Sequence, residues 1–358
     1  VYLASLSGVV PTAANARYYA RGVIGKANQR LLVQEGQNLQ ELAEKGAVGE
    51  DDIADIGVRL AQITHGESLD RGGSFRSALR EVMNDISEEI EGKKNRSDDY
   101  VSTGLESLDG MLNGGWLKGW PHFVAARPGM GKSALVCHSL SALRKRGGNC
   151  VFVSLEMPRA QIVRRQLSAE SRLNLRFAQT LKEYEVQRLM TAYKALYDAP
   201  GNYWVMDAPK FSALNLRAKL VEKIREWGSV DLVVIDYLQR VRQPGMESKA
   251  AMDAAVAETT EIAKRYNVAL VWLSQLNRDV EKRDDKMPRM SDLKGTGDVE
   301  EVAYSVTGLL RPSYYDENSD MQGRAIAGVL KSKDGATGST VLGFEEHCTR
   351  FYDLREDS

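Results

Sequence analysis

Cysteine is scarce in this chain of 358 residues, which carries only three, Cys137, Cys150 and Cys348. They are too few for a disulfide framework, and their wide spacing excludes a Cys-x-x-Cys metal motif. We therefore predict that these thiols pack in the core of a protein from the reducing cytoplasm.

Long hydrophobic runs and an excess of one charge are also missing. No apolar stretch approaches the length of a membrane-spanning helix, and no signal peptide is recognisable. We therefore expect no membrane partner. The formal net charge is −1, so any surface that binds nucleic acid has to be local. With 43% apolar and 27% charged residues, the composition is that of a soluble globular protein.

Residues 1–70 show helical periodicity only. Apolar residues recur at helical spacing from Pro11 onward, and a second apolar stripe runs from Glu50 to Thr64. This pattern predicts an antiparallel helical hairpin that is too small to bury a good core alone. Because the chain opens at Val1 inside a helical pattern, without Met, we expect it to be part of a longer or processed chain.

Residues 71–99 are predicted to form a linker that contains one amphipathic helix. Ser74 is a suitable N-cap, and apolar side chains follow it at helical spacing as far as Ile90. Gly92 and a charged tether end the helix. A single apolar stripe between two flexible joints has to dock somewhere, and the pattern leaves open whether its own domain or an adjacent subunit receives it.

From Tyr100 onward, apolar runs alternate with helical patterns, which predicts an α/β domain with a mostly parallel sheet. The runs that we expect to form strands are residues 122–125, 151–155, 202–207, 231–236, 269–274 and 304–310. Two late strands are expected at residues 325–331 and 340–344, as a hairpin.

A glycine-bearing turn, residues 126–133, separates the first of these predicted strands from a helical pattern. Its sequence is Ala-Arg-Pro-Gly-Met-Gly-Lys-Ser, with Ala at the first position, where the strict phosphate-binding loop has Gly. Gly129 and Gly131 let backbone N–H groups turn toward a polyphosphate at the start of a helix. Lys132 can reach the β- and γ-phosphates, and Ser133 can offer its hydroxyl to Mg²⁺. The turn therefore predicts that the chain binds a nucleoside triphosphate.

Three polar residues end other predicted strands, at the edge of the sheet where nucleotides bind in such folds. Asp236 is placed to act as the Mg²⁺-linked carboxylate, and Glu156 to orient or deprotonate the attacking water. The amide of Gln275 can sense the γ-phosphate. Each residue also has an ordinary structural interpretation, such as a capping Asp or an acid at a helix N-terminus.

A polar and basic segment follows Gln275, and within it Gly295 and Gly297 stand beside Lys294. Exposed N–H groups and one lysine suit the phosphates of a nucleic-acid backbone, which are bound without sequence preference. Aromatic side chains for base stacking are absent from this segment. From composition alone, a mobile surface loop is the better interpretation.

Together these stretches resemble the hexameric replicative DNA helicases of the DnaB type, which have a RecA-like motor. The resemblance covers nearly all of residues 100–358, and residues 1–91 resemble the second half of the family's N-terminal domain with its linker helix. The motifs that carry it are Thr103-Gly104-Leu105 with Leu108-Asp109, the loop Ala125 to Ser133, Ser154-Leu155-Glu156-Met157-Pro158, Ile235-Asp236-Tyr237-Leu238-Gln239, Leu273-Ser274-Gln275-Leu276-Asn277-Arg278, Ser291-Asp292-Leu293 and Glu317-Asn318-Ser319-Asp320.

The resemblance implies a RecA-like P-loop NTPase domain at 100–358, preceded by a partial helical N-terminal domain at 1–70 and a linker at 71–99. It implies ATP and Mg²⁺ as cofactors and single-stranded DNA as the substrate that the motor moves along, 5′→3′, while unwinding the duplex. A homohexameric ring, a helicase loader and a primase are the implied partners. The linker helix is then expected to dock on the neighbouring motor domain.

The resemblance also implies roles for single residues. Glu156 matches the catalytic glutamate, Gln275 the γ-phosphate sensor, and Ser133 with Asp236 the metal-binding pair. The residues that match the family's nucleotide-binding loop are Arg127, Gly129, Met130, Gly131, Lys132, Ser133 and Ala134. The residues that match the loop on single-stranded DNA are Lys294, Gly295 and Gly297, where the family usually has Arg-Glu in place of Lys294-Gly295.

One departure concerns the residues expected to reach into a neighbour's nucleotide. The family usually has a Lys-x-Arg pair on the late hairpin, whereas this chain has Lys331 and Lys333. Lysine supplies the charge without the planar, bidentate fork of arginine. We therefore expect slower hydrolysis, or a greater dependence on Lys331.

Two other functions are compatible with such a chain. A RecA-like, DNA-dependent ATPase can act as a recombination mediator without unwinding, and a nucleotide-gated assembly factor needs no catalysis. The linker helix and the helical hairpin argue against the first. The set of Glu156, Asp236 and Gln275 argues against the second.

Overall fold

We describe the protein from a computed structural model, which covers residues 74–92, 96–208, 210–242, 245–293 and 297–354, and scattered positions between 26 and 44. The chain divides into two units, Val1–Glu88 and Glu89–Ser358, which we treat separately. The described positions between Lys26 and Glu44 are helical. The second helix expected within residues 1–70 lies outside the described residues, so the helical hairpin and the domain boundaries stay predictions.

Helix α4 (Phe75–Ile90) is the amphipathic helix expected in the linker. The Ser74 side chain accepts a hydrogen bond from the Ser77 amide at 3.2 Å, which confirms the predicted N-cap. The side chains of its apolar stripe are all exposed: Phe75, Leu79, Val82, Met83, Ile86 and Ile90. The helix therefore has an apolar face that no described residue of the chain covers.

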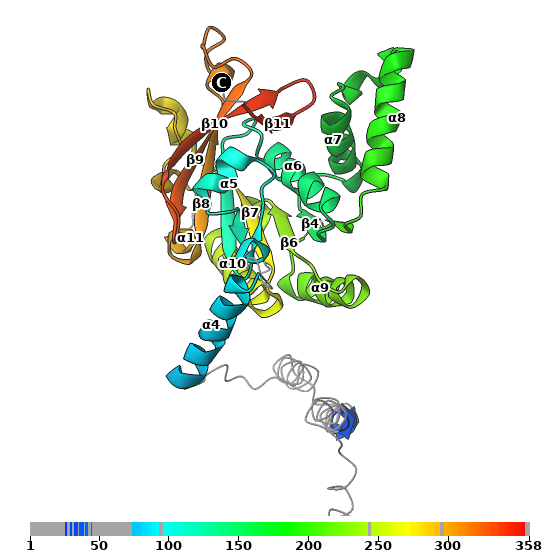
Figure 1. Cartoon of the computed structure of the whole chain (residues 1–358), viewed down its shortest axis with the longest axis vertical. Coiled ribbons are helices and arrows are strands. Elements are labelled where there is room, and N and C mark those ends of the chain that lie inside the picture. The colour runs from blue at the N-terminus through cyan, green and yellow to red at the C-terminus, as the bar shows by residue number, and fades with distance from the viewer. Residues whose placement is uncertain are drawn as a thin grey trace, which may run out of the picture. The chain divides into compact units, whose positions relative to one another are not determined.

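The second unit is built on a nine-stranded sheet, in the order β11-β10-β9-β8-β3-β7-β6-β4-β5 (Figure 1). The parallel strands are β3 (Pro121–Ala126), β4 (Cys150–Ser154), β5 (Tyr203–Asp207), β6 (Leu232–Asp236), β7 (Ala269–Gln275) and β8 (Ser305–Leu310). The antiparallel strands at one side are β9 (Arg324–Ser332), β10 (Gly338–Glu345) and β11 (Arg350–Asp353). The predicted α/β fold with a mostly parallel sheet is confirmed.

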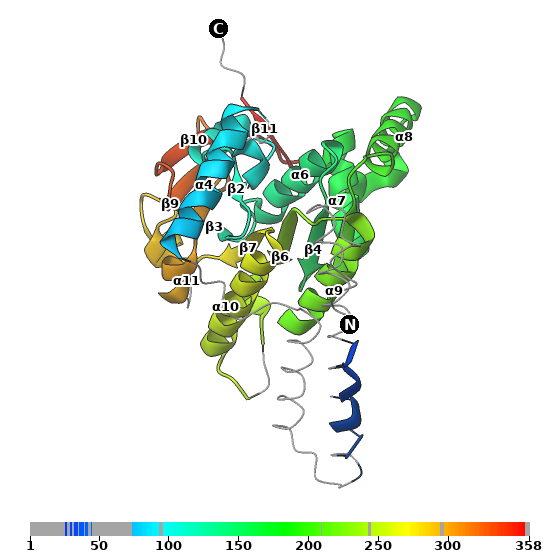
Figure 2. The same ribbon diagram turned by 60° about the horizontal axis from the view of Figure 1, so that its bottom comes forward.

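Helices lie on both faces of this sheet (Figures 1 and 2). They are α5 (Glu106–Met111), α6 (Lys132–Lys145), α7 (Arg159–Ser171), α8 (Glu183–Tyr197), α9 (Ala213–Trp227), α10 (Ser248–Tyr266) and α11 (Gly297–Val302). Successive strand residues alternate between two apolar cores, so Val124 packs with Leu135 of α6, whereas Phe123 packs in the core that contains Leu220 of α9. Burial on both faces explains why the central strands are continuous apolar runs.

Three short strands were not expected from the sequence. Strands β1 (Tyr100–Val101) and β2 (Trp116–Leu117) form a separate two-stranded sheet, and β11 pairs with β10. Runs of two to four residues carry too little periodicity to be recognised, because their pairing depends on the partner strand.

The cysteines are all buried and free, as predicted. Burial raises the pKa of Cys137 to about 12, so this thiol stays protonated and unreactive. In the part of the chain that the structure describes, no helix combines the length and the apolar character needed to span a bilayer.

His122 is a buried titratable group in the centre of the sheet. Its Nδ1 lies 2.8 Å from the Ser305 hydroxyl and its Nε2 lies 3.0 Å from the Leu117 carbonyl oxygen. Burial lowers the pKa of His122 to about 4, because desolvation disfavours the charged imidazolium. The ring is therefore neutral in the folded protein at any pH near neutrality.

We expect His122 to make the fold acid-sensitive. Between pH 6.5 and about 4 the unfolded chain binds a proton here that the folded chain does not, so stability falls as the pH falls through this window. The loss approaches about 3 kcal/mol near pH 4. Urea unfolding of wild type and His122→Asn at several pH values measures it: the variant should lose less stability on acidification, whereas a His347→Asn control at an exposed site should follow wild type. Equal losses in wild type and His122→Asn would contradict this account.

Candidate functional site

A cleft of about 820 Å³ lies at the carboxyl edge of the parallel strands. Most of the residues that the sequence predicted for a nucleotide site line this one cleft, although they come from distant parts of the chain. They are Gly129, Gly131, Lys132, Ser133, Ala134, Glu156, Asp236 and Gln275. The structure therefore brings together the loop after β3 and the ends of β4, β6 and β7.

The register of the sheet explains this convergence. Ala126 at the end of β3 pairs with Gln275 at the end of β7, and Ser154 at the end of β4 pairs with Asp236 at the end of β6. Parallel strands that end level must deliver their following residues to the same edge. Glu156 is the second residue beyond β4 and so joins them.

The turn between β3 and α6 depends on its two glycines. Gly129 has φ 82° and Gly131 has φ 99°, values that favour glycine. A Cβ at Gly129 would stand 3.0 Å from the Tyr314 ring, and one at Gly131 would stand 3.0 Å from the Phe351 ring. Gly131 is also the N-cap of α6, whose first N–H groups have no partner within the helix. The turn is thus a preformed anion site.

Lys132 supplies the positive charge of the loop. Its ammonium group donates hydrogen bonds to the carbonyl oxygens of Ala126, at 2.9 Å, and Arg127, at 3.4 Å. Burial lowers the pKa of Lys132 to about 8, partly offset by the negative charges of Asp236 and Glu156. A bound polyphosphate would favour the ammonium form and raise this pKa again.

Ser133 and Asp236 form the candidate metal site. The Ser133 hydroxyl donates to the Asp236 carboxylate at 2.7 Å. Burial raises the pKa of Asp236, while the bond from Ser133 and the charge of Lys132 act in the opposite direction. A hydroxyl and a carboxylate side by side at the mouth of a phosphate-binding loop are the oxygen donors that Mg²⁺ prefers, so these residues fit that ion.

Glu156 and Gln275 flank this pair with different degrees of freedom. The Glu156 carboxylate is about half exposed and lies 3.6 Å from the guanidinium of Arg240. Gln275 is held at its backbone: its amide donates to Oε1 of Gln239 at 2.9 Å, and Nε2 of Gln239 donates to the Ser274 hydroxyl at 2.9 Å. Glu156 is therefore free to meet a solvent molecule, whereas Gln275 stands at a braced strand end.

The side chains of Arg127 and Met130, expected to contact the nucleotide, do not line the cleft. Met130 is buried in the apolar core beneath the turn. Arg127 donates to the Glu281 carboxylate and to the Leu276 carbonyl oxygen, both at 2.8 Å. Only the backbone of these two residues is left to meet a phosphate.

Lys331 and Lys333 do not line the cleft of their own chain either. Lys331 donates a short hydrogen bond to the Glu300 carbonyl oxygen, and the Lys333 ammonium group lies over the Trp120 ring, 4.4 Å from its centre. Of the predicted DNA-binding residues, Lys294 and Gly295 lie outside the described part of the chain. Gly297 begins α11.

Sequence reasoning missed a set of basic residues on the cleft wall: Arg164, Arg165, Arg176 and Arg311. Arg311 donates to the Gly129 carbonyl oxygen at 3.0 Å and pairs with Glu346 at 2.9 Å. Its guanidinium also lies 4.3 Å from the centre of the Phe344 ring. Because Arg311 follows β8 directly, the strand-end rule that identified Asp236 and Gln275 would have found it too. These cations suit a polyphosphate ligand.

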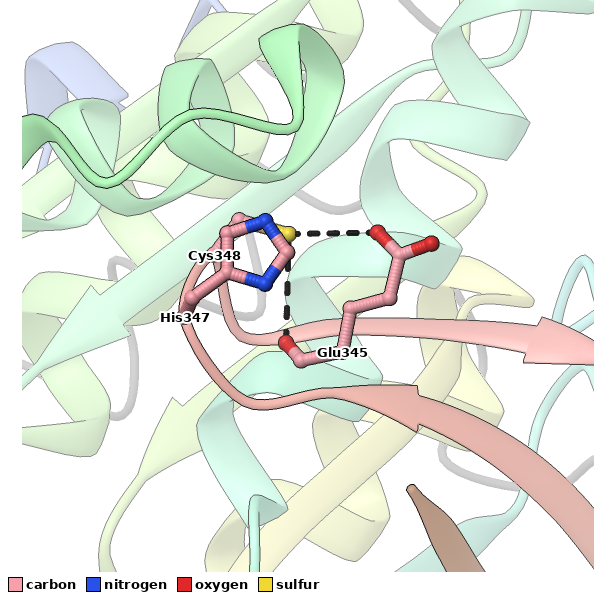
Figure 3. A group of neighbouring side chains, drawn as sticks. All are labelled: Glu345, His347 and Cys348. Atoms are coloured by element: carbon pink, nitrogen blue, oxygen red, sulfur yellow. Dashed lines mark hydrogen bonds between the residues drawn. The ribbon is translucent and has the colours of Figure 1, made fainter.

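The turn between β10 and β11 closes one side of the cleft (Figure 3). Among the described residues, Glu345, His347 and Cys348 are the group whose ligand atoms, all within 4.8 Å of one another, are close enough to hold a metal ion. The Cys348 thiol donates to the Glu345 carboxylate at 3.3 Å, and that carboxylate also pairs with Arg350 at 3.3 Å. Burial and this carboxylate raise the pKa of Cys348 to about 12. A protonated thiol and an already paired carboxylate are poor ligands, so we interpret the turn as cleft wall.

Comparison with known proteins adds a family to this geometry. The family described as DnaB-like helicase C terminal domain matches residues 100–353. The replicative DNA helicase DnaB of Leifsonia xyli subsp. xyli (strain CTCB07) is 32% identical over 99% of this chain and 77% of its own length. The DnaB helicase of Geobacillus stearothermophilus is 31% identical over 99% of this chain and 78% of its own length.

Solved structures agree with the fold. The structure of a DnaB-like replicative helicase and its interactions with primase superposes with a TM-score of 0.75 at 22% identity, covering 99% of this chain and 83% of that one. A second solved structure, of an isolated ATPase domain, superposes with a TM-score of 0.70 at 25% identity, covering 79% of this chain and 100% of that one. The expected RecA-like architecture is confirmed.

We expect nucleotide affinity to fall as Lys132 loses its proton. Above about pH 8 the empty cleft holds a neutral amine, so binding a polyphosphate requires uptake of a proton and weakens on the order of tenfold per pH unit. Titration with a fluorescent ATP analogue between about pH 7.5 and 9.5 measures the slope. Lys132→Ala should bind weakly at every pH in this range, and a flat profile for the wild-type protein would contradict the prediction.

Proposed function

Because this chain belongs to the family of DnaB-like helicases, we propose that it is an ATP-dependent replicative DNA helicase that works as a ring and moves 5′→3′ on single-stranded DNA. The observation that carries the proposal is the cleft, where Lys132, Ser133, Glu156, Asp236 and Gln275 lie together. The relatives that share about 30% of their residues with it over nearly the whole chain are named replicative DNA helicases.

In this proposal the turn after β3 binds the ATP phosphates. The N–H groups at the start of α6 and the Lys132 ammonium group hold the β- and γ-phosphates. Ser133 and Asp236 would hold Mg²⁺, which when bound neutralises charge on the phosphate oxygens. The cleft arginines, Arg311 among them, add to the positive field that attracts the nucleotide.

Glu156 and Gln275 then have distinct tasks. The half-exposed carboxylate of Glu156 can orient the attacking water and accept its proton. Its partner Arg240, at 3.6 Å, keeps the carboxylate at the cleft without the tight geometry of a short ion pair. Gln275, held by Gln239, places an amide where the γ-phosphate ends, so the loss of that phosphate changes the hydrogen bonds of one strand end.

The cleft of a single chain lacks the two lysines expected to complete it. Lys331 and Lys333 sit on and just after β9, bound to their own chain through Glu300 and Trp120. We infer that they serve the cleft of a neighbouring copy, as the family resemblance implies. A cation that enters from a second subunit would make hydrolysis depend on assembly.

Two uncovered apolar faces support assembly. Helix α4 exposes its whole stripe, and α8 exposes Tyr184, Met190, Tyr193 and Tyr197, of which the last two stack at 5.6 Å. Monomeric proteins seldom leave such faces in water. We infer that α4 of one copy docks on the motor domain of the next, with α8 as the receiving face.

The remaining partners rest on the resemblance. We infer that Lys294, Gly295 and Gly297 grip the phosphates of single-stranded DNA. The structural relative studied with primase makes a primase the expected partner for this chain as well, and a helicase loader is expected beside it. This work would take place in the cytoplasm.

We expect Glu156→Gln to lower the ATP turnover number by about 10²- to 10⁴-fold, because the amide cannot accept the proton of the attacking water. Binding of ATP should stay within a few-fold of wild type. Turnover and nucleotide affinity measured on the same preparations separate the two effects. The control is Glu170→Gln on α7, whose carboxylate pairs with Lys145 on the surface.

Unchanged turnover in Glu156→Gln would remove this residue from the reaction. Unwinding of a forked DNA with a 5′ tail tests the rest of the proposal. A protein that hydrolyses ATP on DNA without opening the fork would be a recombination mediator instead of a helicase.

A further inference from the structure

Arg127 has no part in the cleft, although it opens the phosphate-binding turn. Its side chain is 9% exposed and makes two hydrogen bonds to a single region. Nε donates to the Glu281 carboxylate, and Nη1 donates to the Leu276 carbonyl oxygen, both at 2.8 Å. Leu276 directly follows Gln275, so Arg127 joins the nucleotide turn to the chain that leaves the γ-phosphate sensor.

That chain forms a closed lobe, residues 276–293. Leu276 and Leu293 pair as an antiparallel bridge at its base, and the Asn277 amide donates to the Asp292 carbonyl oxygen at 2.8 Å. Arg283 closes it from within by two parallel hydrogen bonds to the Asp292 carboxylate, at 3.1 and 2.8 Å. The lobe is therefore a stiff unit whose two ends move together.

The lobe also shares a small apolar core with the sheet. Val280 and Leu276 are buried with Ala125 of β3, and Leu293 packs against them. This core is separate from the two main cores of the domain. The lobe thus touches the start of the nucleotide turn twice, through Ala125 and through Arg127.

We propose that Arg127 is a positioning residue that couples the nucleotide turn to the DNA-binding loop through Glu281 and the lobe 276–293. The inference rests on the proposed function, since it takes the residues after Leu293 as the DNA contact. A buried guanidinium that holds both a carboxylate and a carbonyl oxygen fixes the lobe in orientation as well as in distance. A shift of the turn around a phosphate is therefore passed to Leu293, the residue next to Lys294.

Coupling of this kind is reciprocal. ATP must change the affinity for DNA by the same factor as DNA changes the affinity for ATP, and such factors are typically about 5- to 150-fold. Removing the link should move both factors toward one and leave each ligand's affinity in the absence of the other close to wild type. A residue that only stabilises the fold would not change the two factors together.

The test uses Glu281→Gln, which keeps the size of the side chain and removes its charge, in the full chain. Affinity for a fluorescent oligothymidylate is measured with and without a non-hydrolysable ATP analogue and Mg²⁺, and affinity for the analogue with and without the oligonucleotide. We expect both factors to fall several-fold, with DNA-free ATP turnover within twofold of wild type. The matched control is Asp279→Asn in the same turn, an exposed carboxylate paired with Lys282, which should keep the wild-type factors.

Glu281→Asp keeps the charge and should retain most of the coupling. Wild-type factors in Glu281→Gln would overturn the proposal, and so would a loss of folding in both Glu281 variants, since the pair would then be structural. A wild-type protein that fails to bind the oligonucleotide would instead remove the proposed function, and the coupling with it. The two failures are thus told apart by the wild-type measurement.

Discussion

The parallel register of four strands is the constraint on which the site depends. Because β3 ends level with β7, and β4 with β6, four separate stretches of chain reach one edge of the sheet. The main apolar cores on the two faces hold this register, since a slip by one residue would exchange the sides of Phe123 and Val124. The cleft is therefore a consequence of the packing of the sheet, and its polar residues add chemistry to a place that the core defines.

The site combines rigid and free groups in a way that suits phosphate chemistry. Gly129, Gly131 and the pair of Ser133 with Asp236 are held by close contacts and a 2.7 Å hydrogen bond. Lys132 is desolvated, so its charge is strongly felt by a phosphate and its proton is easily lost when no phosphate is present. The Glu156 carboxylate, by contrast, is half exposed. Preorganised cations with one mobile carboxylate are what transfer of a phosphoryl group to water requires.

Much of this arrangement could be predicted from the sequence, because strong local patterns carried it. Buried strands such as 231–236 are unbroken apolar runs, and Asp236 and Gln275 could be placed by the rule that parallel strands end at one edge. What escaped prediction depends on contacts between distant residues. Strand β11 exists because β10 pairs with it, and the side chain of Arg127 turns away from the nucleotide because Glu281 is its partner. No local pattern encodes either partnership.

The claim that the active site is shared between copies of the chain explains both the missing lysines of the cleft and the uncovered faces of α4 and α8. Its most direct test is ATP turnover per subunit, measured over a range of protein concentrations, with and without single-stranded DNA, for wild type and Lys333→Ala. The account predicts that wild-type turnover rises cooperatively with concentration and is stimulated by DNA, while Lys333→Ala binds ATP and fails to hydrolyse it. Turnover that is independent of concentration, of DNA and of Lys333 would contradict it.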